Sequence, residues 1–168
     1  MADKRTIVLN AKQIEQKINR IAYEVFENNY DEKEIIIAGI AHSGYLLAER
    51  IETVLKKISG IQTSIIKITL NKKSPLESNE KNAAIKNIDG KVVILVDDVL
   101  NSGKTLIYGA KLFLHAPVKK LSTVVLVDRN HTRYPVKADY VGLSLSTTLQ
   151  EHIEADFSKK EKESVYLI

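Results

Sequence analysis

The feature that most constrains the fold of this chain is the stretch formed by residues 91–106. It opens with five consecutive apolar residues, 92–96, a run that is short for a helix and typical of a strand buried on both faces of a parallel sheet. Two carboxylates, Asp97 and Asp98, follow, and a small polar turn at 101–105 leads into apolar positions at helical spacing. The stretch therefore predicts a buried strand, an acidic pair, a hydroxyl-rich loop and a helix, in that order.

Each part of this stretch suits a phosphorylated sugar. Backbone N–H groups, hydroxyls and an ammonium at a helix N-terminus favour a phosphate, and residues 102–105 offer all three. Gly103 permits a positive φ and a close approach of the backbone. Adjacent carboxylates at the end of a central strand suit a ribose diol or a Mg²⁺-bound ligand. A Walker A loop needs a glycine where Asp98 stands, so an ordinary NTPase is disfavoured.

The segment Val-Asp-Asp-Val-Leu-Asn-Ser-Gly-Lys-Thr at 96–105 resembles the phosphoribosyl-pyrophosphate (PRPP) motif of type I phosphoribosyltransferases. The resemblance implies that Asp97 and Asp98 are the catalytic pair, which binds the ribose hydroxyls and, through PRPP, Mg²⁺. It assigns the 5′-phosphate of PRPP to the loop that follows, at Asn101, Ser102, Gly103, Lys104 and Thr105. The alternative is an ordinary strand-to-helix turn that happens to be rich in Asp and Gly.

Apolar patterns on either side of this stretch predict one α/β domain over residues 1–168. Core strands are expected at 35–40, 64–70, 92–96, 121–127 and 139–143, with a short strand at 6–9 and an edge strand at 165–168. Helices are expected at 14–25, 47–58 and 106–114, the first preceded by a capping box at Asn10 and Gln13. Alternating strands and helices give a doubly wound, mainly parallel five-stranded sheet with helices on both faces. Residues 144–168 are expected to form a small irregular hood.

Three loops leave the carboxyl ends of the expected core strands, the edge at which open parallel sheets bind ligands. They are 41–44, 97–105 and 128–135. The resemblance assigns the leaving pyrophosphate to Ala41, His42, Ser43 and Gly44. Their backbone amides and one hydroxyl suit an anion, and His42 is the single side chain there that can carry charge; the alternative is a tight strand-to-helix turn. The polar segment 71–87 is expected to be a long exposed loop.

Two further segments are similar to the PyrR family of pyrimidine-operon attenuators and uracil phosphoribosyltransferases. They are Leu-Val-Asp-Arg-Asn-His at 126–131 and Pro-Val-Lys-Ala-Asp-Tyr-Val-Gly at 135–142. The chain departs from that family in three places: Ser43 stands where a basic residue is usual, Asn-Lys-Lys-Ser at 71–74 replaces Tyr-Arg-Asp-Asp, and 144–150 lacks Ile-Pro-Thr-Ser.

The resemblance to the PyrR family also implies which residues contact the nucleobase or belong to the hood. The residues concerned are Asp128, Arg129, Leu149, Gln150 and Asp156. For the three charged ones, surface ion pairs are the alternative explanation.

Together these resemblances imply an enzyme that transfers the phosphoribosyl group of PRPP to a nucleobase, with Mg²⁺, and releases pyrophosphate. Asn101 occupies the position where 6-oxopurine transferases carry an aspartate, so its neutral amide favours uracil over a purine. The missing cations on the pyrophosphate side predict slow turnover. A homo-oligomer, a dimer or larger, is also expected.

A different class of function is a nucleotide-sensing RNA-binding regulator of pyrimidine genes, which keeps the nucleotide pocket as a sensor. The altered loops favour it, as does the segment 119–137, which holds five cationic side chains and the single carboxylate of Asp128. A net charge of only +4 for the whole chain and the lack of an aromatic-rich stacking sequence argue against RNA binding. A transferase-like domain with neither activity is the third possibility.

The composition of the chain excludes several other classes of protein. The chain has no cysteine, so it can form neither a disulfide framework nor a thiolate metal site, and its four histidines lack metal-ligand spacing. The N-terminal residues lack the apolar core of a signal peptide, and no apolar run reaches membrane-spanning length. These features predict a cytoplasmic protein without a membrane partner.

Overall fold

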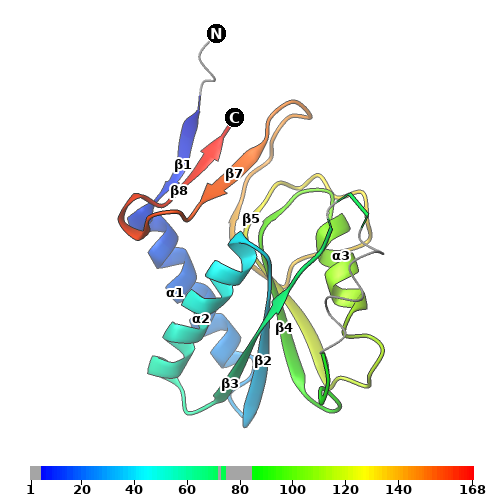
Figure 1. Cartoon of the computed structure of the whole chain (residues 1–168). Coiled ribbons are helices and arrows are strands. Elements are labelled where there is room, and N and C mark those ends of the chain that lie inside the picture. The colour runs from blue at the N-terminus through cyan, green and yellow to red at the C-terminus, as the bar shows by residue number, and fades with distance from the viewer. Residues whose placement is uncertain (1–4, 72, 75–84) are drawn as a thin grey trace.

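The computed structural model describes residues 5–71, 73–74 and 85–168. Its main layer is a five-stranded parallel sheet in the order β3-β2-β4-β5-β6. The strands are β2 (Glu34–Ile40), β3 (Gln62–Ile68), β4 (Val92–Leu100), β5 (Lys120–Asp128) and β6 (Tyr140–Ser144). Helices α1 (Ala11–Glu27) and α2 (Ser43–Ile58) cover one face of the sheet and α3 (Lys104–Lys111) the other (Figure 1). The predicted doubly wound architecture is confirmed.

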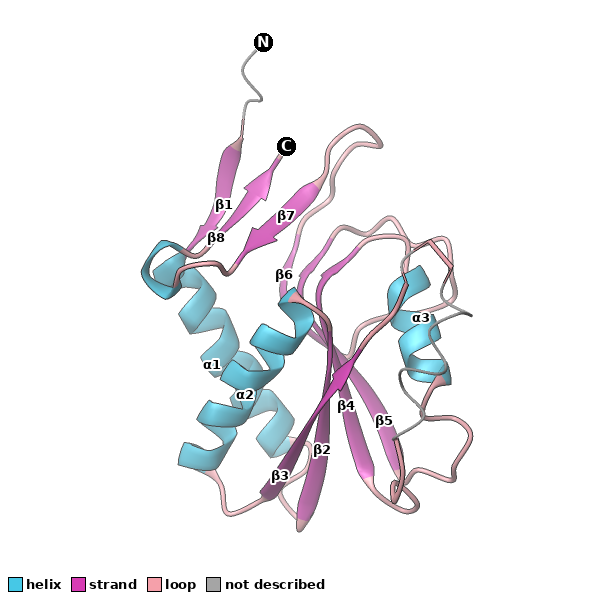
Figure 2. Cartoon of the chain, viewed as in Figure 1, coloured by secondary structure: helices cyan, strands magenta, loops and turns pink. Residues whose placement is uncertain are grey.

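A second, antiparallel sheet of three strands forms the hood, in the order β1-β8-β7. Its strands are β1 (Thr6–Asn10), β7 (Ile153–Asp156) and β8 (Ser164–Leu167), and the short 3-10 helix η3 (Lys160–Lys162) connects the last two. Figure 2 shows this sheet above the ends of α1 and α2 and apart from α3. The expectation of an irregular hood needs correction, because two strands within 144–168, β7 and β8, pair with each other, and β8 also pairs with β1 from the opposite end of the chain.

The central strand is buried on both faces, as its unbroken apolar run predicts. Val92, Ile94 and Val96 of β4 pack into the core beneath α1 and α2, whereas Val93 and Leu95 pack into the core beneath α3. All five side chains have an exposed fraction of 0%. Each such side chain stabilises the fold by about 1.5–3 kcal/mol when buried, so β4 anchors both layers of helices.

The first helix begins at the predicted capping box. The side chain of Asn10 accepts a hydrogen bond from Gln13 N, and the side chain of Gln13 accepts one from Asn10 N, both at 2.9 Å. The apolar side chains that recur at helical spacing are buried, namely Ile14, Ile18, Ile21 and Val25. Through this face α1 packs against α2 and β6, and its N-terminus follows hood strand β1 directly in the chain.

The end of β4 differs from the sequence-based expectation. The strand does not stop at residue 96 but runs to Leu100, and Asp97, Val99 and Leu100 stay paired with β5. Val99 and Leu100 are themselves buried, which continues the apolar strand beyond the charged pair. The two carboxylates therefore belong to the last part of the strand, which holds them more rigidly than a loop would.

Other helix and strand boundaries differ slightly from those that the sequence predicts. The helix expected at 106–114 covers Lys104–Lys111 and is followed by turns, and the strand expected at 64–70 covers Gln62–Ile68. Most of the long loop expected at 71–87 lies outside the described residues. In the part of the chain that is described, no helix has the length and apolarity to cross a bilayer.

Candidate active site

The carboxyl ends of β2, β4 and β5 are neighbours in the sheet, so the loops that follow them meet at one edge. A cavity of about 290 Å³ opens there, between the sheet and the hood. The end of β4, its loop and the start of α3 supply residues 97–103, Thr105 and Leu106 to the lining. Ser43 at the start of α2 and residues 153–155 of β7 complete it. This cavity therefore combines one residue of the predicted pyrophosphate loop with most of the predicted PRPP motif.

The acidic pair lies in the wall of this cavity. Asp97 is buried and Asp98 half-buried. Each carboxylate accepts a hydrogen bond from the backbone of the next residue: Asp98 N donates to Asp97 Oδ1 at 3.0 Å, and Val99 N donates to Asp98 Oδ1 at 2.8 Å. These local bonds fix the orientation of both side chains. A carboxylate has about four lone-pair sites, so such a pair suits a ligand with adjacent hydroxyl groups.

The loop after β4 turns into α3 at Gly103. This residue has φ = +84°, and a Cβ added there would lie 2.4 Å from Val136 Cγ1, so the turn requires glycine. Ser102 Oγ accepts a hydrogen bond from Lys104 N at 3.3 Å. The side chains of Ser102 and Thr105 thus flank a helix N-terminus at the cavity, which is a favourable site for an anion. Lys104 itself is not part of the lining.

The loop after β2 reaches the same cavity through Ser43. Ala41 N donates to Ile68 O at 2.8 Å, and the peptide bond between Ala41 and His42 is cis. Gly44 is packed directly against β4, where an added Cβ would lie 2.7 Å from the carbonyl oxygen of Val96. The N-terminus of α2 is therefore held beside the acidic pair, with Ser43 in the lining.

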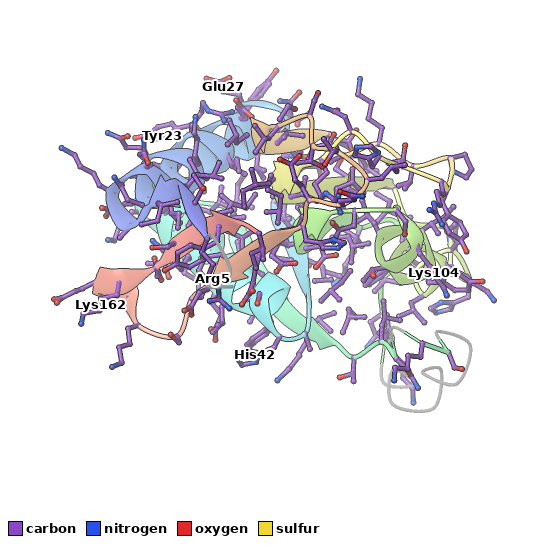
Figure 3. All side chains as sticks on the ribbon, turned by 90° about the horizontal axis from the view of Figure 1, so that it is seen from above. Arg5, Tyr23, Glu27, His42, Lys104 and Lys162 are labelled. Atoms are coloured by element: carbon purple, nitrogen blue, oxygen red, sulfur yellow. The ribbon has the colours of Figure 1, made fainter. Side chains whose placement is uncertain are left out.

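His42 of the predicted pyrophosphate loop and Lys104 of the predicted phosphate loop do not meet. Figure 3 looks down on the carboxyl ends of the strands and shows His42 beside the start of α2 and Lys104 beside α3. His42 is exposed and outside the lining. A cationic side chain does lie near this end of α2: Lys67 Nζ of β3 is 5.5 Å from the centre of the Tyr45 ring. Desolvation and the nearby Glu49 carboxylate raise the pKa of Tyr45.

A second cavity, of about 440 Å³, adjoins the first at Asn101 and Ser102. The loop after β5 lines it with residues 129–133, and the hood side contributes Leu149 and His152. Ser102 O accepts hydrogen bonds from the backbone N–H groups of Arg133 and Tyr134, at 2.8 and 3.1 Å. The loops after β4 and β5 are therefore joined, and a ligand can extend from one cavity into the other.

The predicted nucleobase and hood residues fall into two groups. Arg129 and Leu149 line the second cavity, Arg129 buried and Leu149 79% exposed. Asp128, Gln150 and Asp156 line neither cavity. Asp128 Oδ1 accepts a hydrogen bond from Asn130 N at 2.8 Å at the end of β5. The carboxylate of Asp156 accepts one from Ser158 N, also at 2.8 Å, and this bond lowers the pKa of Asp156.

Sequence reasoning missed the hood strand β7, which lines the first cavity with Ile153, Glu154 and Ala155. A signal was present, because Ile153, Ala155 and Phe157 alternate with two carboxylates in the manner of a half-buried strand. The loop 128–135 is expected at this edge of the sheet, and its residues 130–133 do line the second cavity, although only Asp128 and Arg129 are predicted there as site residues.

The combined site can hold a ligand with several distinct parts. The carboxylate pair accepts from hydroxyl groups, and the starts of α3 and α2 attract two separate anionic groups. The second cavity, next to Asn101 and Arg129, offers amide and guanidinium donors to a polar ring. A ribose with a phosphate at one end, a pyrophosphate at the other and a base beside it matches this order.

Comparison with known proteins agrees with this geometry. The family described as phosphoribosyl transferase domain matches residues 4–162. The Bifunctional protein PyrR of Macrococcus caseolyticus is 32% identical over 173 residues, which cover 98% of this chain and 99% of that protein. The Bifunctional protein PyrR of Fusobacterium nucleatum is 33% identical over 177 residues and covers both chains completely.

Solved structures share the fold at lower sequence identity. The hypoxanthine phosphoribosyltransferase of Trypanosoma cruzi superposes with a TM-score of 0.76 at 17% identity, covering 96% of this chain and 95% of that one. HGPRT-ase from Leishmania tarentolae in complex with GMP gives a TM-score of 0.75 at 14% identity, covering 100% and 99%. The domain match, the named relatives and the shared fold all indicate the same family. The chain belongs to the type I phosphoribosyltransferase family, in which it resembles the PyrR members over its whole length.

Proposed function

We propose that this chain transfers the 5-phosphoribosyl group of PRPP to uracil and releases pyrophosphate. The observation that carries the proposal is a single cavity lined by the acidic pair, the start of α3 and Ser43 of α2. The acidic pair suits the ribose hydroxyls, the start of α3 the 5′-phosphate, and the start of α2 the pyrophosphate. The second cavity, beside Asn101 and Arg129, then takes the nucleobase.

In the proposed reaction, the bond between the anomeric carbon of PRPP and a pyrophosphate oxygen breaks, and a bond from that carbon to N1 of uracil forms. Pyrophosphate leaves with the electron pair of the broken bond, and the N1 proton passes to solvent. Positive charge develops on the ribose in an oxocarbenium-like transition state. Asp97 and Asp98 stabilise that charge electrostatically, while the two helix N-termini hold the anionic ends of PRPP in line with the base.

Mg²⁺ is the cofactor that this reaction would use. Carboxylate oxygens are the protein ligands that Mg²⁺ prefers, and Asp97 and Asp98 could supply them. Among the described residues, no group of three or more His, Asp or Glu side chains could enclose a metal ion. The ion would therefore be held mainly through the oxygens of PRPP, a common arrangement for Mg²⁺. When bound, it neutralises charge on the leaving pyrophosphate.

Two features support uracil as the base. The relatives that match the chain over its full length are named as PyrR proteins, and the segments at 126–131 and 135–142 of this chain resemble that family. Asn101, which borders both cavities, has a neutral amide where the 6-oxopurine transferases carry an aspartate. The purine transferases among the solved structures share the fold only, because their sequence identity is 14–22%.

The test is a panel of nucleobases with PRPP and Mg²⁺, scored by release of pyrophosphate. We expect turnover with uracil and little with hypoxanthine or guanine. The double variant Asp97→Asn, Asp98→Asn should lose most PRPP affinity while it keeps the fold, and Asp31→Asn, which changes an exposed carboxylate outside both cavities, is the control. Fast turnover with a purine and none with uracil would overturn the proposal.

A second candidate is a nucleotide-sensing RNA-binding regulator, which the word "bifunctional" in the names of the relatives favours. The basic segment 119–137 gives it less support than its composition suggests. Lys119 forms an ion pair with Glu32, Lys120 donates to the residues just after α1, and Arg129 is buried. Salt-sensitive binding of an RNA hairpin, without turnover of any base, would favour this candidate.

We also propose that the protein is cytoplasmic and forms a homo-oligomer, a dimer or larger. The first is based on the lack of an apolar signal-peptide core and of an apolar run of membrane-spanning length in the sequence, and the second on the family resemblance. Light scattering of the purified protein gives its mass in solution, and a monomeric mass of 18.9 kDa at working concentrations would contradict the oligomer.

A further inference from the structure

Arg129 has an unusual environment for a cationic side chain. It is 8% exposed, and its guanidinium donates hydrogen bonds to Asn101 Oδ1 at 2.9 Å, Thr147 Oγ1 at 3.1 Å and the carbonyl oxygens of Thr148, at 3.4 Å, and Glu151. All four acceptors are neutral, and no ion pair among the described residues includes Arg129. A buried guanidinium normally has a carboxylate partner, because burying a charge is costly.

The contacts of Arg129 connect two parts of the site. Asn101 lies in the loop after β4, which carries the predicted 5′-phosphate site, whereas Thr147, Thr148 and Glu151 lie in the segment that leads from β6 into hood strand β7. The carboxylate of Glu151 is occupied elsewhere: Thr148 N donates to it at 2.7 Å, and this bond, with a smaller effect of Arg129, lowers the pKa of Glu151. The guanidinium is thus a fixed bridge between the phosphate loop and the hood.

This bridge determines which way the Asn101 amide faces. A guanidinium has donors only, so the atom of Asn101 that meets Arg129 must be the carbonyl oxygen Oδ1. The N–H₂ group of the amide is then turned away from Arg129. Asn101 lines both cavities, and its N–H₂ group has no hydrogen-bond partner among the described residues. Asn101 is exposed, so these two donors are free to meet a ligand where the two cavities join.

We propose that Arg129 is a positioning residue that holds the Asn101 amide with its N–H₂ group toward the nucleobase, so that the site selects a pyrimidine with a carbonyl oxygen at C4. This inference rests on the proposed function and names the specificity determinant of the same site. Uracil offers an acceptor at C4, whereas cytosine offers an amino group, which would oppose the amide donors. The charge of Arg129 also polarises the amide and strengthens its N–H groups as donors.

The polarised donors act most strongly as the base reacts. When N1 of uracil bonds to the ribose and loses its proton, negative charge spreads onto the ring carbonyl oxygens before it is neutralised. The hydrogen bond from an N–H group to the C4 oxygen then becomes stronger in the transition state than in the bound substrate. Such a difference raises kcat more than it lowers KM. Arg129 should therefore influence kcat with uracil while it leaves PRPP affinity unchanged.

The first test is Asn101→Asp. Its carboxylate still accepts from Arg129 and keeps the size of the side chain, but it has no N–H₂ group. We expect the ratio of kcat/KM for uracil to that for cytosine to fall by about tenfold or more, since one hydrogen bond with a charged component is lost. Both values are measured at saturating PRPP, so that an effect of the new carboxylate on PRPP binding, to whose predicted site Asn101 belongs, cancels in the ratio. An unaltered ratio would overturn the proposal.

The second test is a double-mutant cycle, which asks whether Arg129 acts through Asn101. Arg129→Met alone should lower the uracil-to-cytosine ratio, whereas in the Asn101→Ala background the same change should leave the ratio where it is. Arg129→Lys, which keeps a buried cation, replaces Arg129→Met if the latter does not fold. Equal effects of the Arg129 substitution in both backgrounds would mean that Arg129 is structural only, and the proposal would fail.

The control is Arg20→Met. Arg20 also donates to backbone carbonyls, those of Val141 and Gly142 at 3.0 and 2.7 Å, but it lines neither cavity. Its loss should lower stability without altering the uracil-to-cytosine ratio.

Calorimetric binding of UMP and CMP separates failure of this inference from failure of the proposed function. If the wild type discriminates UMP from CMP through Asn101 but transfers phosphoribose to no base, the proposed function fails and this inference stands. If the wild type transfers to uracil and the variants keep the same uracil-to-cytosine ratio, only this inference fails.

Discussion

At the scale of single residues, Gly44 determines how closely α2 can approach the central strand. A Cβ at this position would lie 2.7 Å from the carbonyl oxygen of Val96, closer than real Cβ atoms come to another atom, and 3.0 Å from Cα of Asp97, which is also a tight contact. Glycine therefore places the N-terminus of α2, with Ser43, directly beside the acidic pair. The sequence indicates that Gly44 follows a strand, but not what it touches, because its partners lie in a strand far along the chain.

We expect Gly44→Ala to weaken PRPP binding at least about tenfold and to lower the free energy of unfolding by about 1–3 kcal/mol, because α2 must move away from β4. Calorimetry with PRPP and unfolding in urea measure the two effects. Gly60→Ala is the matched control, since an added Cβ there meets nothing within 4 Å. PRPP affinity equal to that of the wild type would show that the start of α2 takes no part in binding.

At the scale of elements, the hood is the part that sequence reasoning describes least well. The strand β7 lines the cavity, and its residues Ile153 and Ala155, with Phe157 just after it, do alternate with charged ones. The element is only four residues long, however, and pairs with β8, which pairs in turn with β1 from the other end of the chain. Short strands with distant partners give weak local signals, whereas the unbroken apolar runs of β2 and β4 are predictable.

The hood is tied to α2 by an ion pair between Arg50 and Glu163, whose side chains are 21% and 5% exposed. We expect Arg50→Met to lower the free energy of unfolding by about 3–5 kcal/mol, because it leaves a buried carboxylate without its partner. Adding Glu163→Met should restore most of that loss in urea unfolding. The pair of Lys56 with Glu52 is the comparison: the Lys56 side chain is 58% exposed and Glu52 also accepts a hydrogen bond from Thr63, so Lys56→Met should cost less than about 1 kcal/mol. Equal losses in the single and double variants would mean that the charge is not the cause.

At the scale of the whole molecule, the parallel sheet and the three loops at its carboxyl edge follow from the order of buried strands and polar turns. Those loops meet because β2, β4 and β5 are neighbours, and the topology rules for α/β sheets make this arrangement predictable. The bridge from Arg129 to Asn101 joins positions 28 residues apart, in two different loops, and no local pattern encodes it. Composition and periodicity thus predict the framework, whereas the contacts that orient single groups require the coordinates.

The shared cavity leads to a prediction for the molecule as a unit. The sheet, α2, α3 and the hood all line it, so a ligand there binds only the complete fold. We expect PRPP with Mg²⁺, at one hundred times its Kd, to raise the free energy of unfolding by about 2.7 kcal/mol, with a single transition in urea at 25 °C. The double variant Asp97→Asn, Asp98→Asn should gain far less at the same concentration. Two separate transitions, of which PRPP shifts only one, would mean that the hood and the parallel sheet unfold independently.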